Sequence, residues 1–238
     1  TSQDNGAYGL DIGTDLAELL DECCRIKGDF SIRIGMMNPN NVLEIADRLA
    51  GMYKDDKIFK FLHLPVQSGD NEVLKRMNRS YSVEDFKHVV STFRKEVPEV
   101  SLSTDIICGF PGESKEAFKS TIELIKEVKP DIVNVSRFFP RPHTLAESMS
   151  QLPVEEIKSR SRHLSEITKE ISYQKNKVWL NWEGKILIDE KGKDDTWIGR
   201  NFAYKPVVIK SWENLIGKFV YTRVNEAFPT YLKAEVLK

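Results

Sequence analysis

Residues 62–82 of the chain read LHLPVQSGDNEVLKRMNRSYS, and this stretch decides the fold class. It begins inside an apolar run, Ile58–Leu64, that predicts a strand buried on both faces. The polar turn Gln67–Asp70 follows at once, and a helical pattern comes after it. A buried strand that ends in a polar turn before a helix is typical of the parallel sheets of α/β proteins.

Strands and amphipathic helices alternate in the same way across residues 1–150. The predicted strands are Phe30–Ile34, Ile58–Leu64, Val100–Ile107 and Asp131–Arg137. The predicted helices begin at Asp15, at the pair Asn38-Pro39, at a capping-box pattern on Ser82, and at Ser114. Strands that recur about every 30–40 residues, with helices between them, indicate parallel βαβ units.

The pattern changes after residue 150. Pro153 begins a charged helix that runs to about Lys177. Short runs of alternating apolar and polar residues then follow, at Gly184–Asp189, Lys205–Ile209, Gly217–Val224 and Tyr231–Leu237. Several short strands in about 60 residues predict a small antiparallel β-barrel of OB-like size. We therefore expect an α/β part over residues 1–150, a linking helix over 151–176 and a small barrel over 177–238.

The composition excludes several classes of protein. The 238 residues carry 35 Lys and Arg against 36 Asp and Glu, which excludes a highly basic nucleic-acid coat and an acidic tail protein. No run of about 18 apolar residues could cross a membrane, and the first residues lack the pattern of a signal peptide. Residues 177–238 carry 11 Lys and Arg against 8 Asp and Glu. This excess of positive charge is consistent with a barrel surface that binds an anionic partner, and equally with chance variation in a short segment.

The three cysteines favour a reducing compartment, and we expect a cytoplasmic protein. Cys23 and Cys24 are adjacent on a predicted helix, so their side chains point about 100° apart, which is poor geometry for a shared metal. Cys108 ends a predicted strand without an obvious base or second ligand nearby. We interpret all three as packed thiols and predict no metal or cluster site within this chain.

Three turns after predicted strands carry candidate ligand groups. In the first, Gln67-Ser68-Gly69 leads into a helix whose free N–H groups suit a carboxylate or phosphate, and Arg76 and Arg79 follow close enough to pair with such an anion. The alternative is an ordinary turn with solvated arginines. Parallel strands bring such turns to one end of the sheet, where α/β barrels build their ligand sites.

The other two turns are Cys108–Ser114, CGFPGES, and Phe138–Thr144, FFPRPHT. The first allows close approach to a flat ligand, with Phe110 available to stack, although such turns are also common without a ligand. No Gly-Lys-Ser/Thr follows it, so it is not a phosphate-binding P-loop. In the second turn, prolines on both sides of Arg141 hold it ready for an anion; a solvated surface arginine is the alternative.

Four stretches taken together resemble one family, the radical S-adenosylmethionine (SAM) methylthiotransferases. They are TSQDNGAYG at 1–9, LHLPVQSGDNEVLKRMNRSYS at 62–82, DIICGFPGES at 105–114 and FFPRPHTLA at 138–146. Residues 177–238 resemble the TRAM domain that these enzymes carry. The opening nine residues are most similar to the archaeal and eukaryotic branch, which methylthiolates N6-threonylcarbamoyladenosine beside the tRNA anticodon. The other branches modify isopentenyladenosine in tRNA or an aspartate of ribosomal protein S12, and both remain alternatives.

The resemblance implies an α/β fold: a partial (β/α)6 radical SAM barrel, TIM-like and lacking its first strands, followed by the TRAM β-barrel. It implies SAM and two 4Fe–4S clusters as cofactors and tRNA as the partner, in a monomer without membrane contact. In the family, a CxxxCxxC loop and three further cysteines hold the clusters, upstream of the point that corresponds to Thr1. The chain also has no initiator Met. We therefore expect a piece of a longer enzyme that is inactive as it stands.

The resemblance also implies a mechanism. In the intact enzymes, one cluster cleaves SAM to a 5′-deoxyadenosyl radical, which abstracts hydrogen from C2 of the adenine, and a methylated sulfur is transferred there. The cofactors supply this chemistry, while the protein orients the reactants and excludes water. A different class of function, a non-catalytic RNA-binding module carried by the C-terminal barrel, is the main rival.

Site residues follow from the same resemblance. It places Gln67, Ser68, Gly69 and Arg79 at the ribose and methionyl carboxylate of SAM, and Ile107, Gly109 and Phe110 at the adenine. Ser2, Gln3 and Asp4 are expected to face SAM or the target base. The expected tRNA contacts are Arg141, Lys185, Arg200, Tyr204, Lys205 and Arg223, because small β-barrels commonly bind RNA through positive charge and stacking.

Overall fold

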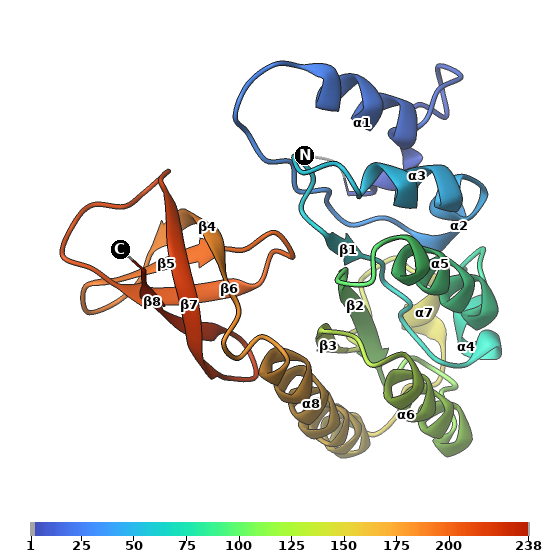
Figure 1. Cartoon of the computed structure of the whole chain (residues 1–238). Helices are drawn as coiled ribbons and strands as arrows, with labels where there is room; N and C mark the ends of the chain where they lie inside the picture. Colours follow the sequence, from blue (N-terminus) through green and yellow to red (C-terminus); the bar gives the residue numbers. More distant parts are fainter. Residues whose placement is uncertain (1–2, 238) are drawn as a thin grey trace.

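The computed structural model describes residues 3–237 as two packed parts (Figure 1). The first part holds a parallel sheet of three strands, β1 (Phe61–His63), β2 (Ser101–Cys108) and β3 (Ile132–Arg137). The second is a closed barrel of five strands, β4 (Glu183–Lys191), β5 (Thr196–Arg200), β6 (Pro206–Lys210), β7 (Phe219–Ala227) and β8 (Leu232–Val236). The predicted α/β sheet and small β-barrel are therefore confirmed.

The helices precede, separate and follow the strands of the sheet. They are α1 (Leu16–Arg25), α2 (Pro39–Val42), α3 (Ala46–Met52), α4 (Asn71–Arg76), α5 (Val83–Glu96), α6 (Lys115–Val128), α7 (Leu145–Ser148) and α8 (Val154–Lys177). Two 3-10 turns, η1 (Asn5–Ala7) and η2 (Leu43–Ile45), complete this part. The helix predicted from the pair Asn38-Pro39 is thus interrupted by η2, while α5 begins as predicted. Its capping box is formed, with Asp85 N donating to Ser82 Oγ at 3.1 Å and Ser82 N donating to Asp85 Oδ2 at 2.8 Å.

One predicted strand is wrong. Within Phe30–Ile34, only Ile32 pairs with the sheet, as a single parallel bridge to Ile58. The residues that follow contact the edge of the sheet without forming a strand: Met37 N donates to His63 O on β1 at 3.0 Å, while Met36 O accepts from Asn5 N at 2.9 Å. The neighbouring Gly35 lies so close to Asn5 that a Cβ there would be 2.4 Å from Asn5 Nδ2.

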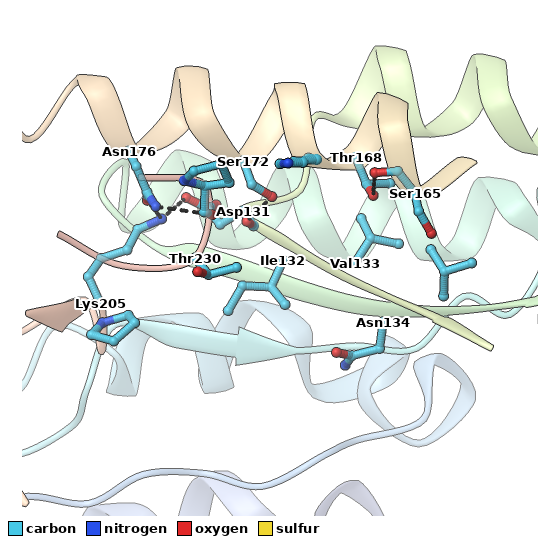
Figure 2. A pocket seen from close by; sticks show the side chains of 14 residues that line it. Asp131, Ile132, Val133, Asn134, Ser165, Thr168, Ser172, Asn176, Lys205 and Thr230 are labelled. Atoms are coloured by element: carbon cyan, nitrogen blue, oxygen red, sulfur yellow. Dashed lines mark hydrogen bonds and ion pairs between the residues drawn. The ribbon is translucent and has the colours of Figure 1, made fainter. Parts of the chain in front are cut away.

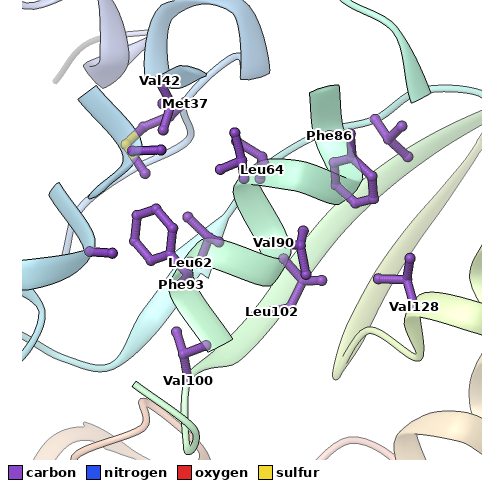
Figure 3. Packing of buried hydrophobic residues seen from close by; sticks show 14 of the residues in the cluster. Met37, Val42, Leu62, Leu64, Phe86, Val90, Phe93, Val100, Leu102 and Val128 are labelled. Carbon is purple, nitrogen blue, oxygen red and sulfur yellow. The ribbon is translucent and has the colours of Figure 1, made fainter. Parts of the chain in front are cut away.

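The two faces of the sheet have different chemistry. Side chains of one face, such as Leu62, Leu64 and Leu102, are buried against α5 and contribute to the main core together with Phe86 and Phe93 (Figure 3). Alternate residues along a strand point to opposite faces, so Asp105 on β2 and Asn134 on β3 lie on the other face. That second face is the polar one, and it carries the candidate site.

The long helix α8 joins the two parts and packs along β3 and α6. Near its start, Arg160 Nη1 lies 2.6 Å from Glu113 Oε2, and the two side chains are only 7% and 1% exposed. Near its end, Ser172 Oγ donates to the backbone oxygen of Asp131 at 2.8 Å. The helix is therefore fixed to the turn after β2 and to the start of β3.

The small barrel closes in the order β4-β5-β6-β8-β7, with antiparallel pairing except between β6 and β8. Its core contains Ile186, Ile188, Val207 and Leu232. Strand β5 was not predicted, because Gly199 and the preceding Gly and Asp residues resemble a turn. Gly199 is required by close packing instead, since a Cβ there would lie 2.8 Å from Ile186 Cδ1.

A buried ion pair fastens the small barrel to the sheet (Figure 2). Lys205 Nζ donates to Asp131 Oδ1 at 2.7 Å and to Asn176 Oδ1 at 2.9 Å. Lys205 is 3% exposed, so its ammonium cannot reach a phosphate, and its predicted role as a tRNA contact is wrong. Beside it, the ring of Tyr204 packs 5.0 Å from Phe59 and 5.2 Å from Phe61, which makes Tyr204 an interface residue as well.

Candidate functional site

The polar face of the sheet opens into a cavity of about 850 Å³ toward the carboxyl ends of the strands. Strand residues on its wall include His63 from β1, Asp105 and Ile107 from β2, and Asn134, Ser136 and Arg137 from β3. The turns that follow the strands add Gln67, Arg79, Phe138, Phe139, Arg141 and Thr144. The cavity therefore lies where parallel α/β sheets bind ligands.

Asp105 is the centre of a hydrogen-bonded group on the cavity floor. His63 Nε2 lies 3.2 Å from Asp105 Oδ1, and Asn134 Nδ2 donates to the same oxygen at 2.7 Å. Burial raises the pKa of Asp105, but the hydrogen bonds from His63 and Asn134 outweigh it and hold the pKa below its ordinary value. Because the aspartate is ionised, His63 must donate through Nε2.

This arrangement predicts a pH dependence of stability. The lowered pKa of Asp105 stabilises the folded protein above the ordinary aspartate pKa, and the contribution is lost as the pH falls through the folded-state value. The difference in free energy of unfolding between wild type and Asp105→Asn should be constant above about pH 5 and shrink below about pH 4. Urea unfolding followed by circular dichroism at several pH values measures it. A difference that does not change with pH would contradict the role of the charge.

Arg79 is the cavity residue best suited to an anion. Its Nε is buried and has no hydrogen-bond partner among the described residues. Among the cavity residues, Asp105 is the one acid, and His63 and Asn134 already occupy it. A buried donor without a partner costs about 1–3 kcal/mol, which an anionic ligand would recover. The cavity is thus prepared for a carboxylate or phosphate.

The turn after β1 places Gln67 against β2. Gln67 N donates to Asp105 O at 2.8 Å, and Ile107 N donates to Gln67 O at 3.0 Å. This pairing forces Gln67 to a φ of +70°, so the strained backbone is held by the sheet itself. Position 69 requires glycine, because a Cβ there would lie 2.5 Å from the Cα of Thr121 on α6. The sequence of this turn thus presents Gln67 to the cavity.

The structure brings together four of the predicted SAM and tRNA residues, Gln67, Arg79, Ile107 and Arg141, on one cavity wall. Ser68, Gly69, Gly109 and Phe110 lie behind that wall. Phe110 is 6% exposed and its ring packs 5.0 Å from Phe138, so its predicted stacking on a flat ligand is wrong. Gly109, at a φ of +81°, packs against Ile157 and donates to Glu113 Oε2 at 2.9 Å. These four residues shape and support the turns.

The predicted N-terminal residues lie elsewhere. Ser2 is outside the described residues, and Gln3 is exposed. The Asp4 carboxylate accepts hydrogen bonds from Asn38 N at 3.0 Å and from Asn41 Nδ2 at 2.8 Å. It therefore ties the start of the chain to α2, and neither Gln3 nor Asp4 is among the cavity residues.

The remaining predicted tRNA contacts are on the surface of the small barrel. Lys185 is exposed and makes no ion pair with the described residues. Arg223 lies 2.7 Å from Glu183 through Nη2, and Arg200 Nε lies 3.0 Å from Asp189 Oδ2. Two of the three cations thus already have carboxylate partners, which reduces their attraction for a phosphate.

Sequence analysis missed His63, Asp105, Asn134, Ser136 and Arg137 as cavity residues. A signal was present, because Asp105 and Ile107 on one strand and Asn134 and Ser136 on the next follow the two-residue period of a strand face. The same two-residue period in both strands predicts that Asp105, Asn134 and Ser136 share one polar face of the sheet.

The described residues do not suit an iron–sulfur cluster. No group of three or more His, Cys, Asp or Glu side chains within residues 3–237 could hold a metal ion. Cys23 and Cys24 lie on α1, whereas Cys108 is buried at the end of β2. Burial raises the pKa of Cys108 to about 12, so it stays a thiol and is a poor metal ligand.

Comparison with known proteins agrees with this geometry. Residues 10–125 match the model of the radical SAM superfamily, and residues 183–237 match that of the TRAM domain. The chain joins a radical SAM segment to a TRAM domain. The radical SAM and TRAM parts of the resemblance drawn from the sequence are thereby confirmed.

Relatives of this radical SAM and TRAM combination cover the whole chain. The chain is 50% identical to the probable threonylcarbamoyladenosine tRNA methylthiotransferase of Pyrococcus horikoshii. It is 36% identical to the threonylcarbamoyladenosine tRNA methylthiotransferase of Drosophila melanogaster. Both alignments cover 100% of the chain. It spans 55% and 43% of their lengths, which is about half. Among solved structures, the radical SAM enzyme coproporphyrinogen III oxidase (HemN) from Escherichia coli aligns with 88% of the chain and 50% of its own, at 18% identity and a TM-score of 0.49. No helix within residues 3–237 is both long and apolar enough to span a membrane.

Proposed function

We propose that the chain supplies the SAM cavity and an RNA-binding domain to a tRNA methylthiotransferase that acts on N6-threonylcarbamoyladenosine. The observation that carries the proposal is Arg79, whose buried Nε has no described partner in a cavity at the carboxyl ends of parallel strands. Relatives named for this activity support the choice of substrate. We place the protein in the cytoplasm, as a monomer in which residues 151–176 link the two domains.

The cavity residues fit SAM. Arg79 would hold the methionyl carboxylate, because a guanidinium matches a carboxylate in shape and charge and its Nε would gain an acceptor. Gln67 would bond to the ribose hydroxyls, and Ile107 offers apolar surface to the adenine. SAM, when bound, supplies the adenosyl and methyl groups of the reaction. The chain's own contribution is to fix both ends of SAM and to limit access of water.

Iron–sulfur chemistry does not follow from these residues, because no three His, Cys, Asp or Glu side chains within residues 3–237 are grouped as metal ligands. The full-length gene product is therefore the right material for activity measurements. On the RNA side, Arg141 at the cavity mouth and Lys185 on β4 remain candidates for phosphate contacts.

We expect Arg79→Gln to weaken SAM binding about 10–100-fold, because a charge-assisted hydrogen bond contributes about 1.5–3 kcal/mol. Isothermal titration calorimetry of the full-length gene product with SAM measures the effect. Arg162→Gln on the exposed side of α8 is the matched control and should bind as the wild type does. Equal affinity of the Arg79 variant would remove the carboxylate role.

The same variant also tests the substrate. A strain without the gene should lose the methylthio form of N6-threonylcarbamoyladenosine from its tRNA, as measured by mass spectrometry of tRNA nucleosides. The wild-type gene should restore this nucleoside and the Arg79→Gln gene should not. Loss of a methylthio group from isopentenyladenosine or from a ribosomal protein would instead assign the chain to another branch. If no methylthio group is lost at all, the function is RNA binding without catalysis.

A further inference from the structure

A second cavity, of about 450 Å³, lies at the amino ends of the strands, opposite the proposed SAM cavity. Its walls come from three parts of the chain. Ser101 lies at the start of β2, Lys175 near the end of α8, and Trp179 and Trp182 just after that helix, while Phe202 comes from the small barrel. The cavity therefore exists only because the small barrel is docked on the sheet.

One wall of this cavity is aromatic. The ring of Trp179 lies 5.7 Å from Trp182 and 5.6 Å from Phe202, and Trp182 lies 6.2 Å from Phe202. Phe202 is 40% exposed, so the cluster is not closed over as a core would be. A group of rings that faces an open cavity suits the π-face of a flat ligand, such as a nucleobase.

Two polar groups in the same cavity lack partners. Ser101 is 2% exposed, yet its Oγ has no hydrogen-bond partner among the described residues. Lys175 is half-buried and forms no ion pair or hydrogen bond within residues 3–237. Buried polar groups in folded proteins are rarely left unsatisfied, so the Ser101 hydroxyl points to a group that the described residues do not supply. Lys175 is only half-buried, and its ammonium is free to bind such a group.

Lys175 has charges of both signs around it, since Asp131 and Glu99 line the same cavity. Burial lowers the pKa of Lys175, and the nearby charges of Arg94, Lys205 and Lys129 lower it further, whereas Asp131 opposes them. Asp131 is already paired with Lys205 at 2.7 Å, and Glu99 at the rim is exposed to solvent. Because Lys205 neutralises Asp131 and Glu99 is open to solvent, Lys175 is the cation that the cavity lining offers to an anion.

We propose that this cavity binds one nucleotide, with its base against Trp179, Trp182 and Phe202 and its phosphate at Lys175. Ser101, which lines the cavity, would turn its hydroxyl toward the base or the ribose. The volume is within the range of about 300–1,000 Å³ that is usual for small-ligand sites. Two sources share this chemistry, a nucleotide of an RNA chain and a free mononucleotide. The site lies away from Arg79, so it stands or falls independently of SAM binding.

Adenosine 5′-monophosphate is the probe, titrated into the protein with tryptophan fluorescence and calorimetry as readouts. It should bind at least tenfold more tightly than adenosine, inorganic phosphate or N-acetylphenylalanine, because only it has both the base and the phosphate. Tighter binding of N-acetylphenylalanine would show a site for a protein side chain and overturn the proposal, as would absence of nucleotide binding.

Variants locate the binding. Lys175→Gln and Ser101→Ala should each weaken it at least tenfold, whereas Lys169→Gln, on the same helix but outside this cavity, should not. Arg79→Gln should also leave it unchanged, which separates this site from the SAM cavity. Ser101→Ala removes a hydroxyl without a partner, so the unliganded variant should unfold at or above the wild-type temperature, and a lost affinity cannot then be ascribed to misfolding. Equal affinity in all four variants would overturn the proposal.

The two sources are separated by competition. An RNA stem-loop with the sequence of a tRNA anticodon arm should displace adenosine 5′-monophosphate from the wild type if the site holds a nucleotide of RNA. Failure to displace it, with the mononucleotide still dependent on Lys175 and Ser101, would support the site and assign it to a free mononucleotide.

Discussion

Replacing Lys205 by methionine should lower the free energy of unfolding by about 3–5 kcal/mol, the usual effect of removing one partner from a buried ion pair. The Lys205 and Asp131 side chains are 4% and 7% exposed, and Nζ lies 2.7 Å from Oδ1. Without Lys205, Asp131 keeps the hydrogen bond from Leu102 N at 3.0 Å but loses its counterion inside the interface. Chemical denaturation followed by circular dichroism measures the change.

The controls for this prediction test its cause. Lys185→Met removes an exposed lysine from the same barrel and should change the free energy of unfolding by less than about 0.5 kcal/mol. Adding Asp131→Asn to Lys205→Met removes the uncompensated charge and should recover part of the loss. If Lys205→Met is as stable as Lys185→Met, the ion pair does not fasten the two domains.

Replacing Arg160 by methionine should have an effect of similar size at the other end of α8. The Glu113 side chain is 1% exposed and would be left with the Gly109 N–H at 2.9 Å but without a cation. Burial already raises the pKa of Glu113 in the wild type, against the hydrogen bond from Arg160, which lowers it. Loss of Arg160 removes that opposition, and we expect a destabilisation of about 3–5 kcal/mol at neutral pH.

The sign of the pH dependence distinguishes this mechanism from simple loss of packing. A carboxyl group with a raised pKa in the folded state destabilises the protein at high pH and ceases to do so once it is protonated. The deficit of Arg160→Met relative to wild type should therefore shrink as the pH falls toward 4. Glu113→Gln combined with Arg160→Met should be more stable than Arg160→Met alone at neutral pH. A deficit that is constant with pH would mean that lost packing, and not the buried charge, is responsible.

Both predictions concern interactions that sequence analysis interpreted differently or did not find. Lys205 was expected to meet tRNA, because a lysine in a basic barrel normally lies on its surface. The docking of that barrel on Asp131, 74 positions earlier in the chain, buries it instead. Phe110 was expected to stack on a ligand, but Phe138 and the start of α6 enclose it. In each case a distant element decided whether the side chain was free.

The sequence by itself determined most of the local structure: the main helices with their caps, three of the four strands predicted to alternate with them, and four of the five short strands of the small barrel. These follow from hydrophobic periods and turn residues that act over a few positions, as the capping box of Ser82 shows. It also predicted Gln67, Arg79, Ile107 and Arg141 as ligand residues, and these four residues line one cavity.

Only the tertiary structure decided which polar side chains lack partners. Arg79 Nε and Ser101 Oγ have no hydrogen-bond partner among the described residues, whereas Asp105 accepts hydrogen bonds from His63 and Asn134. Burial and pairing depend on contacts between elements far apart in the chain, to which no local pattern responds. For the same reason the cavity between the sheet and the small barrel was not predicted, since neither part contains it alone.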